Sequence, residues 1–343
     1  MTKVLRTENL SIFKSFHFLI SIVFMKVLAN DGLDQSGIDA LTEKGFEVIT
    51  KKVPQELLVD YINEHKIRTL LVRSATQVRK DIIDGCPSLG IIGRGGVGMD
   101  NIDVDYAREK GIHVINTPSA SSESVAELVF AHLFSGARFL QDSNRKMPLV
   151  GDTEFAGLKK AYTAGIELRG KTIGIVGMGR IGQEVARIAL GLGMRVIAAD
   201  NNVGKASIKV KFYNNQFINV DIETEPLQDV LKHSDFITLH VPAQKDGYMI
   251  GKNEFDIMKD GVAVVNCSRG GVIDESALID ALDSGKVKFA GLDVFINEPT
   301  PSKEILNHSK ISLTPHTGAS TLEAQDRIGL SLAEQISSIL QIQ

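Results

Sequence analysis

Residues 172–182, with the sequence TIGIVGMGRIG, decide the fold. The apolar run at the start predicts a strand, and the amphipathic stretch 183–192 predicts a helix. A GxGxxG pattern between a strand and a helix is typical of dinucleotide binding. Gly177 permits the tight turn, Gly179 lets the backbone approach a pyrophosphate, and Gly182 lets the helix pack closely. Free N–H groups at the start of this helix would bind the phosphates.

The acid that follows the next predicted strand favours one cofactor. The apolar run 195–199 ends at Asp200. An acid at this place accepts hydrogen bonds from the adenosine ribose hydroxyls, and its charge repels a 2′-phosphate. Asn201 and Asn202 do not supply the arginine that binding of NADP uses. We therefore expect NAD as the cofactor.

Short apolar runs alternate with amphipathic stretches on both sides of this motif, which is typical of βαβ units with parallel sheets. The remaining strands are predicted at 27–29, 47–49, 69–72, 90–92, 113–115, 236–240, 262–266, 289–294 and 311–314. Helices are predicted, among others, at 36–44, 54–64, 122–138 and 321–340. Residues 141–170 are polar and poorly periodic, and the polar stretch 201–219 allows a short exposed strand. The predicted class is α/β.

The composition excludes several classes of protein. The chain has 343 residues, a length that favours about two domains. Its formal net charge of −4 argues against a nucleic-acid surface. Cys86 and Cys267 are the only cysteines, so we expect no disulfide framework, no metal site and a cytoplasmic location. No apolar run reaches the roughly 18–20 residues of a membrane span.

Residues 1–24 precede the first predicted strand and have two interpretations. A basic stretch followed by the apolar run 16–25 resembles a secretory signal with a cleavage site at 27–29. Alternatively, these residues are a non-native or mis-assigned extension before Met25. We favour the extension, because cleavage at 27–29 would remove the first predicted strand.

Polar residues follow three further predicted strands, at the strand ends where open α/β sheets bind ligands. These residues lie in the segments 267–271, 295–299 and 315–318. His316 can take the proton of an alcohol and return it in the reverse reaction, and a neighbouring carboxylate favours its protonated form. Arg269 can hold a substrate carboxylate or polarise a carbonyl oxygen. This chemistry fits the oxidation of a 2-hydroxy acid by hydride transfer.

Together these segments resemble the D-isomer-specific 2-hydroxyacid dehydrogenase family over essentially all of residues 25–343. Within the family they most resemble the D-3-phosphoglycerate dehydrogenase branch, in a short form without a C-terminal regulatory domain. Besides the glycine motif, the matching segments are RSAT at 73–76, GRGGVGMDNID at 93–103, NTP at 116–118, HVP at 240–242, NCSRG at 266–270 and PHTGA at 315–319. The segment 147–169 departs from the pattern of the relatives.

The resemblance implies a role for each matching residue. His316 would be the general acid/base, Glu298 its partner, and Arg269 a substrate-binding residue. The cofactor would contact Val97, Gly177, Gly179, Arg180, Ile181, Gly182, Asp200, His240, Val241, Pro242, Cys267, Ser268, Asp293, Gly318 and Ala319, with Asp293 at the nicotinamide carboxamide. The substrate would contact Arg73, Ser74, Arg94, Gly95, Gly96, Arg269 and His316, with Arg73 on a phosphate group. For His240 a structural role is favoured over substrate contact, and for Cys267 packing is favoured over a role as nucleophile.

The implied fold has two Rossmann-like domains with the active site in the cleft between them. A flavodoxin-like, discontinuous substrate-binding domain would comprise residues 25–119 and 311–343, and an NAD-binding domain would comprise residues 120–310. A homodimer is also implied, with the predicted helix 122–138 as an element of its interface.

The implied function is NAD-dependent oxidation of D-3-phosphoglycerate to 3-phosphohydroxypyruvate, the first step of serine biosynthesis. One alternative is a glyoxylate/hydroxypyruvate reductase or another D-2-hydroxyacid dehydrogenase on the same scaffold. An alternative of another class is an NAD-sensing corepressor that binds proteins, which the presence of Arg269, Glu298 and His316 does not exclude.

Overall fold

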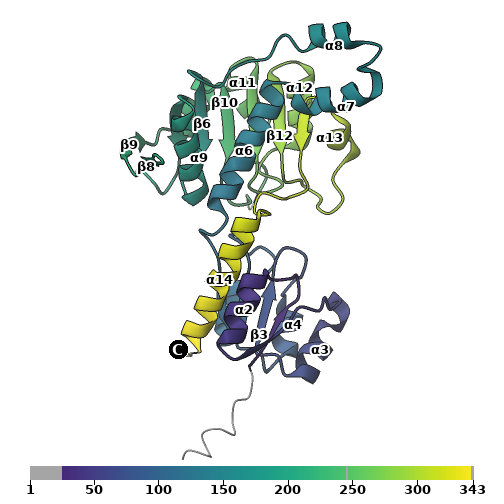
Figure 1. Cartoon of the computed structure of the whole chain (residues 1–343), viewed down its shortest axis with the longest axis vertical. Helices are drawn as coiled ribbons and strands as arrows, with labels where there is room; N and C mark the ends of the chain where they lie inside the picture. The colour runs from purple at the N-terminus through teal and green to yellow at the C-terminus, as the bar shows by residue number, and fades with distance from the viewer. Residues whose placement is uncertain (1–24, 245, 341–343) are drawn as a thin grey trace, which may run out of the picture. The chain divides into compact units, whose positions relative to one another are not determined.

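The computed structural model describes residues 25–244 and 246–340, which form two compact units (Figure 1). The described part of the smaller unit comprises residues 25–120 and 325–340, and the larger unit comprises residues 121–324 apart from residue 245. Both interpretations of residues 1–24 lie outside the described residues.

The smaller unit contains a parallel sheet of five strands in the order β2-β1-β3-β4-β5. The strands are β1 (Met25–Ala29), β2 (Phe46–Ile49), β3 (Thr69–Val72), β4 (Ile91–Arg94) and β5 (His113–Asn116). The helices are α2 (Gln35–Glu43), the short 3₁₀ helix η1 (Gln55–Leu57), α3 (Leu58–His65), α4 (Lys80–Gly85), α5 (Val104–Glu109) and α14 (Leu322–Ile339). This strand order confirms the expected flavodoxin-like arrangement.

Alternating side chains of β1 serve two separate cores in this unit. Val27 and Ala29 pack in the core that also contains side chains of α2 and α14, whereas Leu28 packs in the core that also contains side chains of α3, α4 and α5. Helices α2 and α14 approach closely, because a Cβ atom on Gly37 would lie only 2.6 Å from the Cα atom of Gly329. Both faces of the sheet are therefore covered, which explains the continuous apolar runs of its strands.

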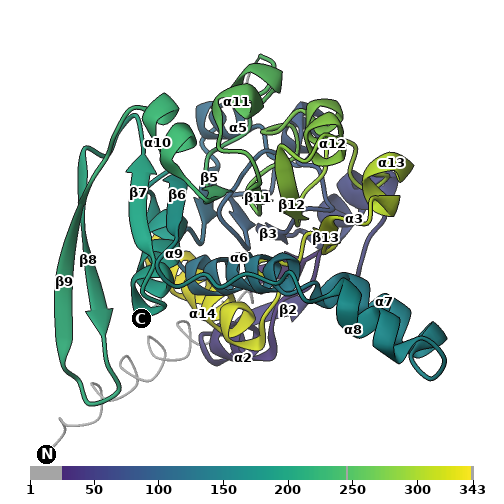
Figure 2. The same ribbon diagram turned by 90° about the horizontal axis from the view of Figure 1, so that it is seen from above.

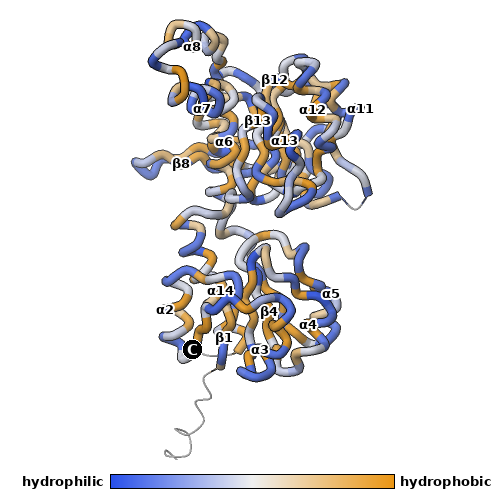
Figure 3. The backbone as a smooth tube through the Cα atoms, turned by 90° about the vertical axis from the view of Figure 1, so that its right-hand side faces the viewer, coloured by the Kyte–Doolittle hydropathy of each residue, from blue (hydrophilic) through white to orange (hydrophobic). Residues whose placement is uncertain are grey.

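The larger unit contains a parallel sheet of six strands in the order β13-β12-β11-β10-β6-β7. The strands are β6 (Thr172–Val176), β7 (Arg195–Ala199), β10 (Phe236–Leu239), β11 (Val262–Asn266), β12 (Val287–Leu292) and β13 (Ile311–Leu313). Helices α6 (Ser122–Ala137) and α9 (Arg180–Gly191) share one core with the sheet. A second core involves α10 (Leu227–His233), α11 (Lys252–Ile257), α12 (Glu275–Asp283) and α13 (Lys303–Asn307). Figure 3 shows apolar residues gathered in the strands of both sheets.

The expected return of the chain to the smaller unit at residue 311 is wrong. Residues Ile311–Leu313 pair with β12 and form the edge strand of the six-stranded sheet, and the chain returns only at residue 325. A short apolar run predicts a buried strand, but it does not reveal which sheet the strand joins. His316 therefore belongs to the larger unit, together with Arg269 and Glu298.

Two polar stretches contain more regular structure than their sequences indicate. Residues 141–170 include most of α7 (Leu140–Val150) and all of α8 (Phe155–Ala161), shown in Figure 2. In α7 no side chain is buried, so this helix has no apolar stripe to reveal it. Instead of one short strand, residues 205–223 form an antiparallel hairpin of β8 (Lys205–Lys211) and β9 (Phe217–Glu223). Every second residue of β8 is buried, and this strand contacts α9.

Within residues 25–244 and 246–340, no helix combines the length and the apolar character that a membrane crossing requires. The same residues contain no group of three or more metal-ligating side chains.

Candidate active site

The glycine motif after β6 forms a cradle that fits a dinucleotide. Gly177 has a φ of +98°, and a Cβ atom there would lie 2.4 Å from the carbonyl oxygen of His240. A Cβ atom on Gly182 would lie 2.0 Å from the carbonyl oxygen of Gly177, whereas one on Gly179 would meet no atom within 4 Å. The first helical hydrogen bond runs from the Gln183 N–H to Gly179, so the preceding amides of α9 are available to phosphates.

The carboxylate of Asp200 fastens this cradle to the end of β7. Its Oδ2 accepts a hydrogen bond from the Met178 N–H at 2.6 Å, and its Oδ1 accepts from the N–H groups of Asn202 at 2.7 Å and Val203 at 3.0 Å. Burial acts to raise the pKa of Asp200, but these hydrogen bonds outweigh it and lower the pKa below its usual value. Since a carboxylate oxygen accepts two hydrogen bonds, Oδ2 can still accept one from a ribose hydroxyl.

Asn266, the last residue of β11, shapes the loop that carries Arg269. Its Oδ1 accepts hydrogen bonds from the Ser268 N–H at 3.0 Å and the Ser268 hydroxyl at 2.8 Å, and its Nδ2 donates to the Arg269 carbonyl at 2.9 Å. A Cβ atom on Gly270 would lie 1.9 Å from the carbonyl oxygen of Phe295. The loop after β11 therefore packs directly against the loop after β12, which contains Glu298.

His316 and Glu298 are hydrogen-bonded to one another in the larger unit. The His316 Nδ1 lies 2.8 Å from the Glu298 Oε2, and the other carboxylate oxygen accepts from the Phe295 N–H at 3.0 Å. The two side chains are 39% and 35% exposed, so a substrate can reach them. Because a carboxylate only accepts hydrogen bonds, Nδ1 carries the proton of the neutral ring. Nε2 is then the ring atom that can exchange a proton with a substrate.

The buried carboxylate of Asp293 holds the loop on which His316 lies. Its Oδ1 accepts hydrogen bonds from the Thr314 hydroxyl at 2.6 Å and the Thr317 N–H at 2.8 Å, and its Oδ2 accepts from the Gly318 N–H at 2.9 Å. His316, within this loop, has a φ of +54°, which is uncommon for a residue with a Cβ atom. Strand β12 ends at Leu292, so Asp293 lies just beyond it rather than inside a strand. The expected contact between Asp293 and a nicotinamide carboxamide stays a prediction.

Burial shifts the pKa values of His240 and Cys267. The His240 Nε2 lies 3.0 Å from the Thr238 hydroxyl, and its buried Nδ1 has no hydrogen-bond partner among the described residues. Burial lowers the pKa of His240 to about 3, so its ring is neutral at physiological pH. Burial also raises the pKa of the Cys267 thiol well above its usual value, which favours a packing role over nucleophilic attack.

In the smaller unit, Asp31 organises the loop that follows β3. Its Oδ2 accepts hydrogen bonds from the N–H groups of Arg73 at 2.7 Å and Thr76 at 3.0 Å, and its Oδ1 accepts from the Thr76 hydroxyl at 2.7 Å. The Lys52 ammonium is paired with the same carboxylate, whose side chain is only 4% exposed. From the other side, Asn101 donates to the carbonyls of Arg73 at 2.8 Å and Thr76 at 2.6 Å.

The loop after β4 lies next to the Arg73 loop, because Val72 and Arg94 are partners in the sheet. Its first residue, Gly95, donates its N–H to the Val72 carbonyl at 2.9 Å. Gly96 has a φ of +153°, and a Cβ atom there would lie 2.1 Å from the Arg94 Nη1. Val97 is 37% exposed. The smaller unit thus brings the predicted substrate residues Arg73, Ser74, Arg94, Gly95 and Gly96 to neighbouring strand ends.

The predicted site residues therefore form two groups, each at the carboxyl ends of strands in its own unit. The larger unit contains the predicted catalytic residues and all the predicted cofactor residues except Val97. Sequence reasoning missed the side chains that hold the loops, chiefly Asp31, Asn101 and Thr314. One signal was available for Asp31, because Asn30 and Asp31 directly follow the first predicted strand.

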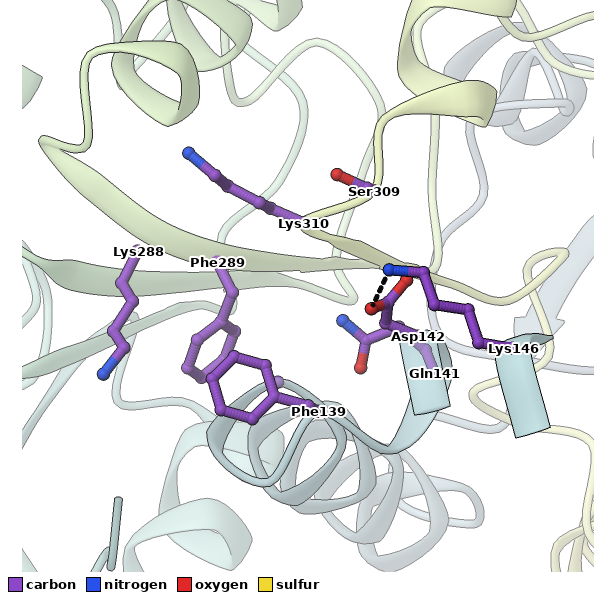
Figure 4. Close-up of a pocket in the computed structure, with 9 residues that line it drawn as sticks. Phe139, Gln141, Asp142, Lys146, Lys288, Phe289, Ser309 and Lys310 are labelled. Carbon is purple, nitrogen blue, oxygen red and sulfur yellow. Dashed lines mark ion pairs between the residues drawn. The ribbon is translucent and has the colours of Figure 1, made fainter. Parts of the chain in front are cut away.

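A separate hollow of about 190 Å³ lies at the opposite end of the larger sheet (Figure 4). Its lining includes Phe139 and Gln141 of the α6–α7 region and Lys288 and Lys310 near the starts of β12 and β13. Figure 4 also shows the ion pair between Asp142 and Lys146, whose atoms are 3.0 Å apart. No predicted site residue lines this hollow.

Residues 130–318 match the family model for the NAD-binding domain of D-isomer specific 2-hydroxyacid dehydrogenases. The chain belongs to this family. It is 43% identical to a hydroxypyruvate reductase of Thermotoga maritima, over 91% of this chain and 97% of that protein. It is 40% identical to a D-3-phosphoglycerate dehydrogenase of Methanocaldococcus jannaschii, over 92% of this chain and 57% of that protein.

Solved structures of 2-hydroxyacid dehydrogenases have the same fold. The holo form of D-mandelate dehydrogenase from Rhodotorula graminis superposes with a TM-score of 0.79 at 27% identity, over 91% of this chain and 93% of that one. The larger unit of this family member is therefore an NAD-binding domain. The chain spans little more than half the length of the phosphoglycerate dehydrogenases that it matches.

Proposed function

We propose that this dehydrogenase oxidises D-3-phosphoglycerate to 3-phosphohydroxypyruvate with NAD, in the cytoplasm, as the first step of serine biosynthesis. The observation that carries the proposal is the pair of His316 and Glu298, whose Nδ1 and Oε2 atoms are 2.8 Å apart. A carboxylate-backed histidine at the same edge of the sheet as an NAD-binding cradle fits the oxidation of an alcohol better than simple binding of a dinucleotide. The cytoplasmic location is supported by two cysteines that are both free and buried.

The chemical step divides between two side chains of the larger unit. The bound cofactor would supply the hydride acceptor for C2 of the alcohol. The His316 Nε2 takes the hydroxyl proton, while Nδ1 keeps its hydrogen bond to Glu298, so the new imidazolium charge faces a carboxylate. Arg269 binds the substrate carboxylate through its guanidinium fork. In the reverse direction, the protonated His316 returns the proton to the carbonyl oxygen.

Arg73 is the residue that we assign to the substrate phosphate. Its backbone is fixed on both sides, by Asp31 at the N–H and by Asn101 at the carbonyl. Because the backbone is already fixed, binding of a phosphate by the guanidinium needs to order only the side chain. The names of the phosphoglycerate dehydrogenase relatives support the same assignment.

A second candidate function is the reduction of hydroxypyruvate, which lacks the phosphate. The Thermotoga maritima reductase favours it, because this chain covers 97% of that protein at 43% identity. The two candidates share the chemical step and differ in what Arg73 contacts.

A panel of kcat/KM values separates these possibilities. It would compare NAD with NADP, and phosphorylated with plain 2-hydroxy acids and their keto forms. We expect NAD to be preferred, and Arg73→Ala to raise the KM for 3-phosphohydroxypyruvate by about tenfold or more while leaving that for hydroxypyruvate nearly unchanged. Arg73→Lys is the matched control, because it keeps the charge and loses the fork. Equal effects on both substrates would refute the phosphate assignment, and no turnover with any substrate would favour the corepressor.

We also propose a homodimer, as the family resemblance implies. Support comes from large apolar side chains that are exposed on α6 to α8, namely Phe134, Leu140, Met147, Leu149 and Phe155. Most of α6 itself is buried within the larger unit, so α7 and α8 offer more free apolar surface than the helix we expected. Light scattering that gives the mass of a single chain would contradict the dimer.

A further inference from the structure

A buried histidine on α6, His132, lies directly behind the loop that carries His316. Its side chain is enclosed, since the residue is only 2% exposed. The His132 Nδ1 lies 2.9 Å from the Ser312 hydroxyl, and its Nε2 lies 3.0 Å from the Thr314 hydroxyl. The neighbouring strand β12 has a glycine at the contact, and a Cβ atom on Gly291 would lie 2.5 Å from the Cβ atom of His132. Strand β12 therefore has no side chain where the imidazole packs.

The hydrogen bonds around His132 have one consistent direction. The Thr314 hydroxyl donates to the Asp293 carboxylate at 2.6 Å, so its single proton is used there. Toward His132 the Thr314 oxygen can only accept, and the donor is the Nε2–H of the ring. Burial lowers the pKa of His132, although the charge of Asp293 acts to raise it. The ring is therefore neutral at physiological pH, and Nδ1 accepts the proton of Ser312.

The polar chain runs from Ser312 through His132 and Thr314 to Asp293. The Ser312 and Ser135 hydroxyl oxygens are 3.4 Å apart, but the Ser312 proton is directed to His132 and the Ser135 proton to Gln141 at 2.9 Å, so the chain ends at Ser312. Such a chain in a protein interior polarises its members and fixes their orientation. At its other end lies the carboxylate that holds the His316 loop.

We propose that His132 is a positioning residue for the acid–base histidine, because its Nε2–H orients the Thr314 hydroxyl toward Asp293. Asp293 then binds the Thr317 and Gly318 amides that follow His316 in the chain. This inference rests on the proposed function, since it concerns the same reacting site. His132 itself contacts neither of the two acid–base side chains.

The proposal predicts a selective effect on the chemical step. Without the Nε2–H, the Thr314 oxygen loses its donor and its hydroxyl can rotate away from Asp293. The loop then holds His316 less firmly, and we expect kcat to fall about tenfold, because small displacements of a reacting group are costly. Substrate KM should change little, because Arg73 and Arg269 are fastened by other side chains.

Three variants test this prediction in the full-length protein. His132→Leu removes the donor and should lower kcat about tenfold with an unchanged substrate KM. His132→Gln keeps an N–H group that can reach Thr314 and should restore most of the loss. Ser312→Ala removes only the contact at Nδ1 and should leave kcat nearly unchanged. A kcat for His132→Leu equal to that of the wild type would overturn the proposal, as would a failure of His132→Gln to restore activity while NADH binding and thermal unfolding stay normal.

A spectroscopic measurement keeps this test separate from the proposed function. In protein with ¹⁵N-labelled histidine, His132 should give a slowly exchanging Nε2–H signal that His132→Gln removes and Thr314→Val shifts. This signal requires no substrate, so it stands even where no 2-hydroxy acid is turned over. A protonated Nδ1 with a bare Nε2 would contradict the orientation that the proposal needs. Absence of turnover in the wild type would instead contradict the proposed function.

Discussion

Asp31 in the smaller unit and Asp293 in the larger unit hold their loops with the same set of donors. Each carboxylate follows a strand and accepts hydrogen bonds from two backbone N–H groups and one threonine hydroxyl. Each loop carries a residue with a proposed function, Arg73 in the smaller unit and His316 in the larger one. The two units therefore fix their working side chains by the same physical means.

Each threonine hydroxyl also accepts a hydrogen bond from a neutral side chain, since the Asn30 Nδ2 lies 2.9 Å from the Thr76 oxygen and the His132 Nε2 lies 3.0 Å from the Thr314 oxygen. The two loops differ in charge, because Asp31 is in addition paired with the ammonium group of Lys52, which balances its charge. Both carboxylates therefore hold their loops in place, and at Asp31 a cation adds to this.

The largest effect is expected from Asp293→Ala. The change leaves the Thr314 hydroxyl and two loop amides without an acceptor, so kcat should fall about 100-fold or more. Asp293→Asn is the matched control, since it keeps an acceptor oxygen but removes the charge, and its loss should be smaller if rigidity is the main contribution. Steady-state kinetics at saturating NAD measures both. A kcat for Asp293→Ala within about threefold of the wild type would show that the chemical step does not depend on Asp293 holding the His316 loop.

A smaller and different effect is expected from Asp31→Ala. The Arg73 loop loses its acceptor, so the KM for a phosphorylated substrate should rise about tenfold while kcat changes little. The free energy of unfolding should fall by about 1–3 kcal/mol, because buried donors stay unpaired. Urea titration and kinetics check both values, with the exposed Asp39→Ala on α2 as the control. A drop in kcat as large as that of Asp293→Ala would erase the distinction between the two loops.

The smallest effect is expected from Lys52→Met, and it depends on pH. Burial acts to raise the pKa of Asp31, but hydrogen bonds from Lys52, Arg73 and Thr76 outweigh it and hold the pKa below its usual 3.8. Asp31 therefore stabilises the fold fully above about pH 4, and this contribution is lost as the pH falls through the lowered pKa. Without Lys52 the pKa is lowered less, and the loss of stability at pH 7 should stay below about 1 kcal/mol.

Urea midpoints measured from pH 7 down to about pH 2 test this contribution. The difference in stability between Lys52→Met and the wild type should be visible at pH 7 and should shrink as the pH falls below about 4. An equal difference at pH 7 and at the lowest pH would show that Lys52 acts through packing rather than through its charge.

Much of the fold followed from short-range patterns in the chain. Continuous apolar runs gave the parallel strands, because a sheet covered on both faces leaves no polar side to its strands. Two regions did not follow from such patterns, namely α7 with α8 and the hairpin of β8 and β9. Helices α7 and α8 bury almost no side chains, so their sequences lack an apolar stripe. Strand β8 does show an alternation, because Ala206, Ile208 and Val210 lie between polar residues, but we predicted only one short strand in this stretch and missed the hairpin.

The candidate site was predictable where a residue type acts through its own chemistry. His316 and Arg269 stand out because proton transfer and carboxylate binding need such side chains just after strands, whereas Glu298 came from the resemblance to the family. The supporting residues Asn101 and His132 gave no such signal, and for Asp31 the one signal was its place directly after a predicted strand. Their partners lie 20 or more positions away along the chain, and a buried histidine within an apolar helix resembles an ordinary packing residue.

The sequence by itself determined the α/β class and the dinucleotide cradle, because each of these depends on residues that are close in the chain or on a motif of fixed spacing. It also led us to expect NAD as the cofactor and His316 with Glu298 as the acid–base pair. Only the tertiary structure decided that Ile311–Leu313 belongs to the larger sheet, and that one buried carboxylate is balanced by Lys52 and the other backed by His132. Strand pairing and the compensation of buried charge are settled by contacts between distant segments, which no local pattern records.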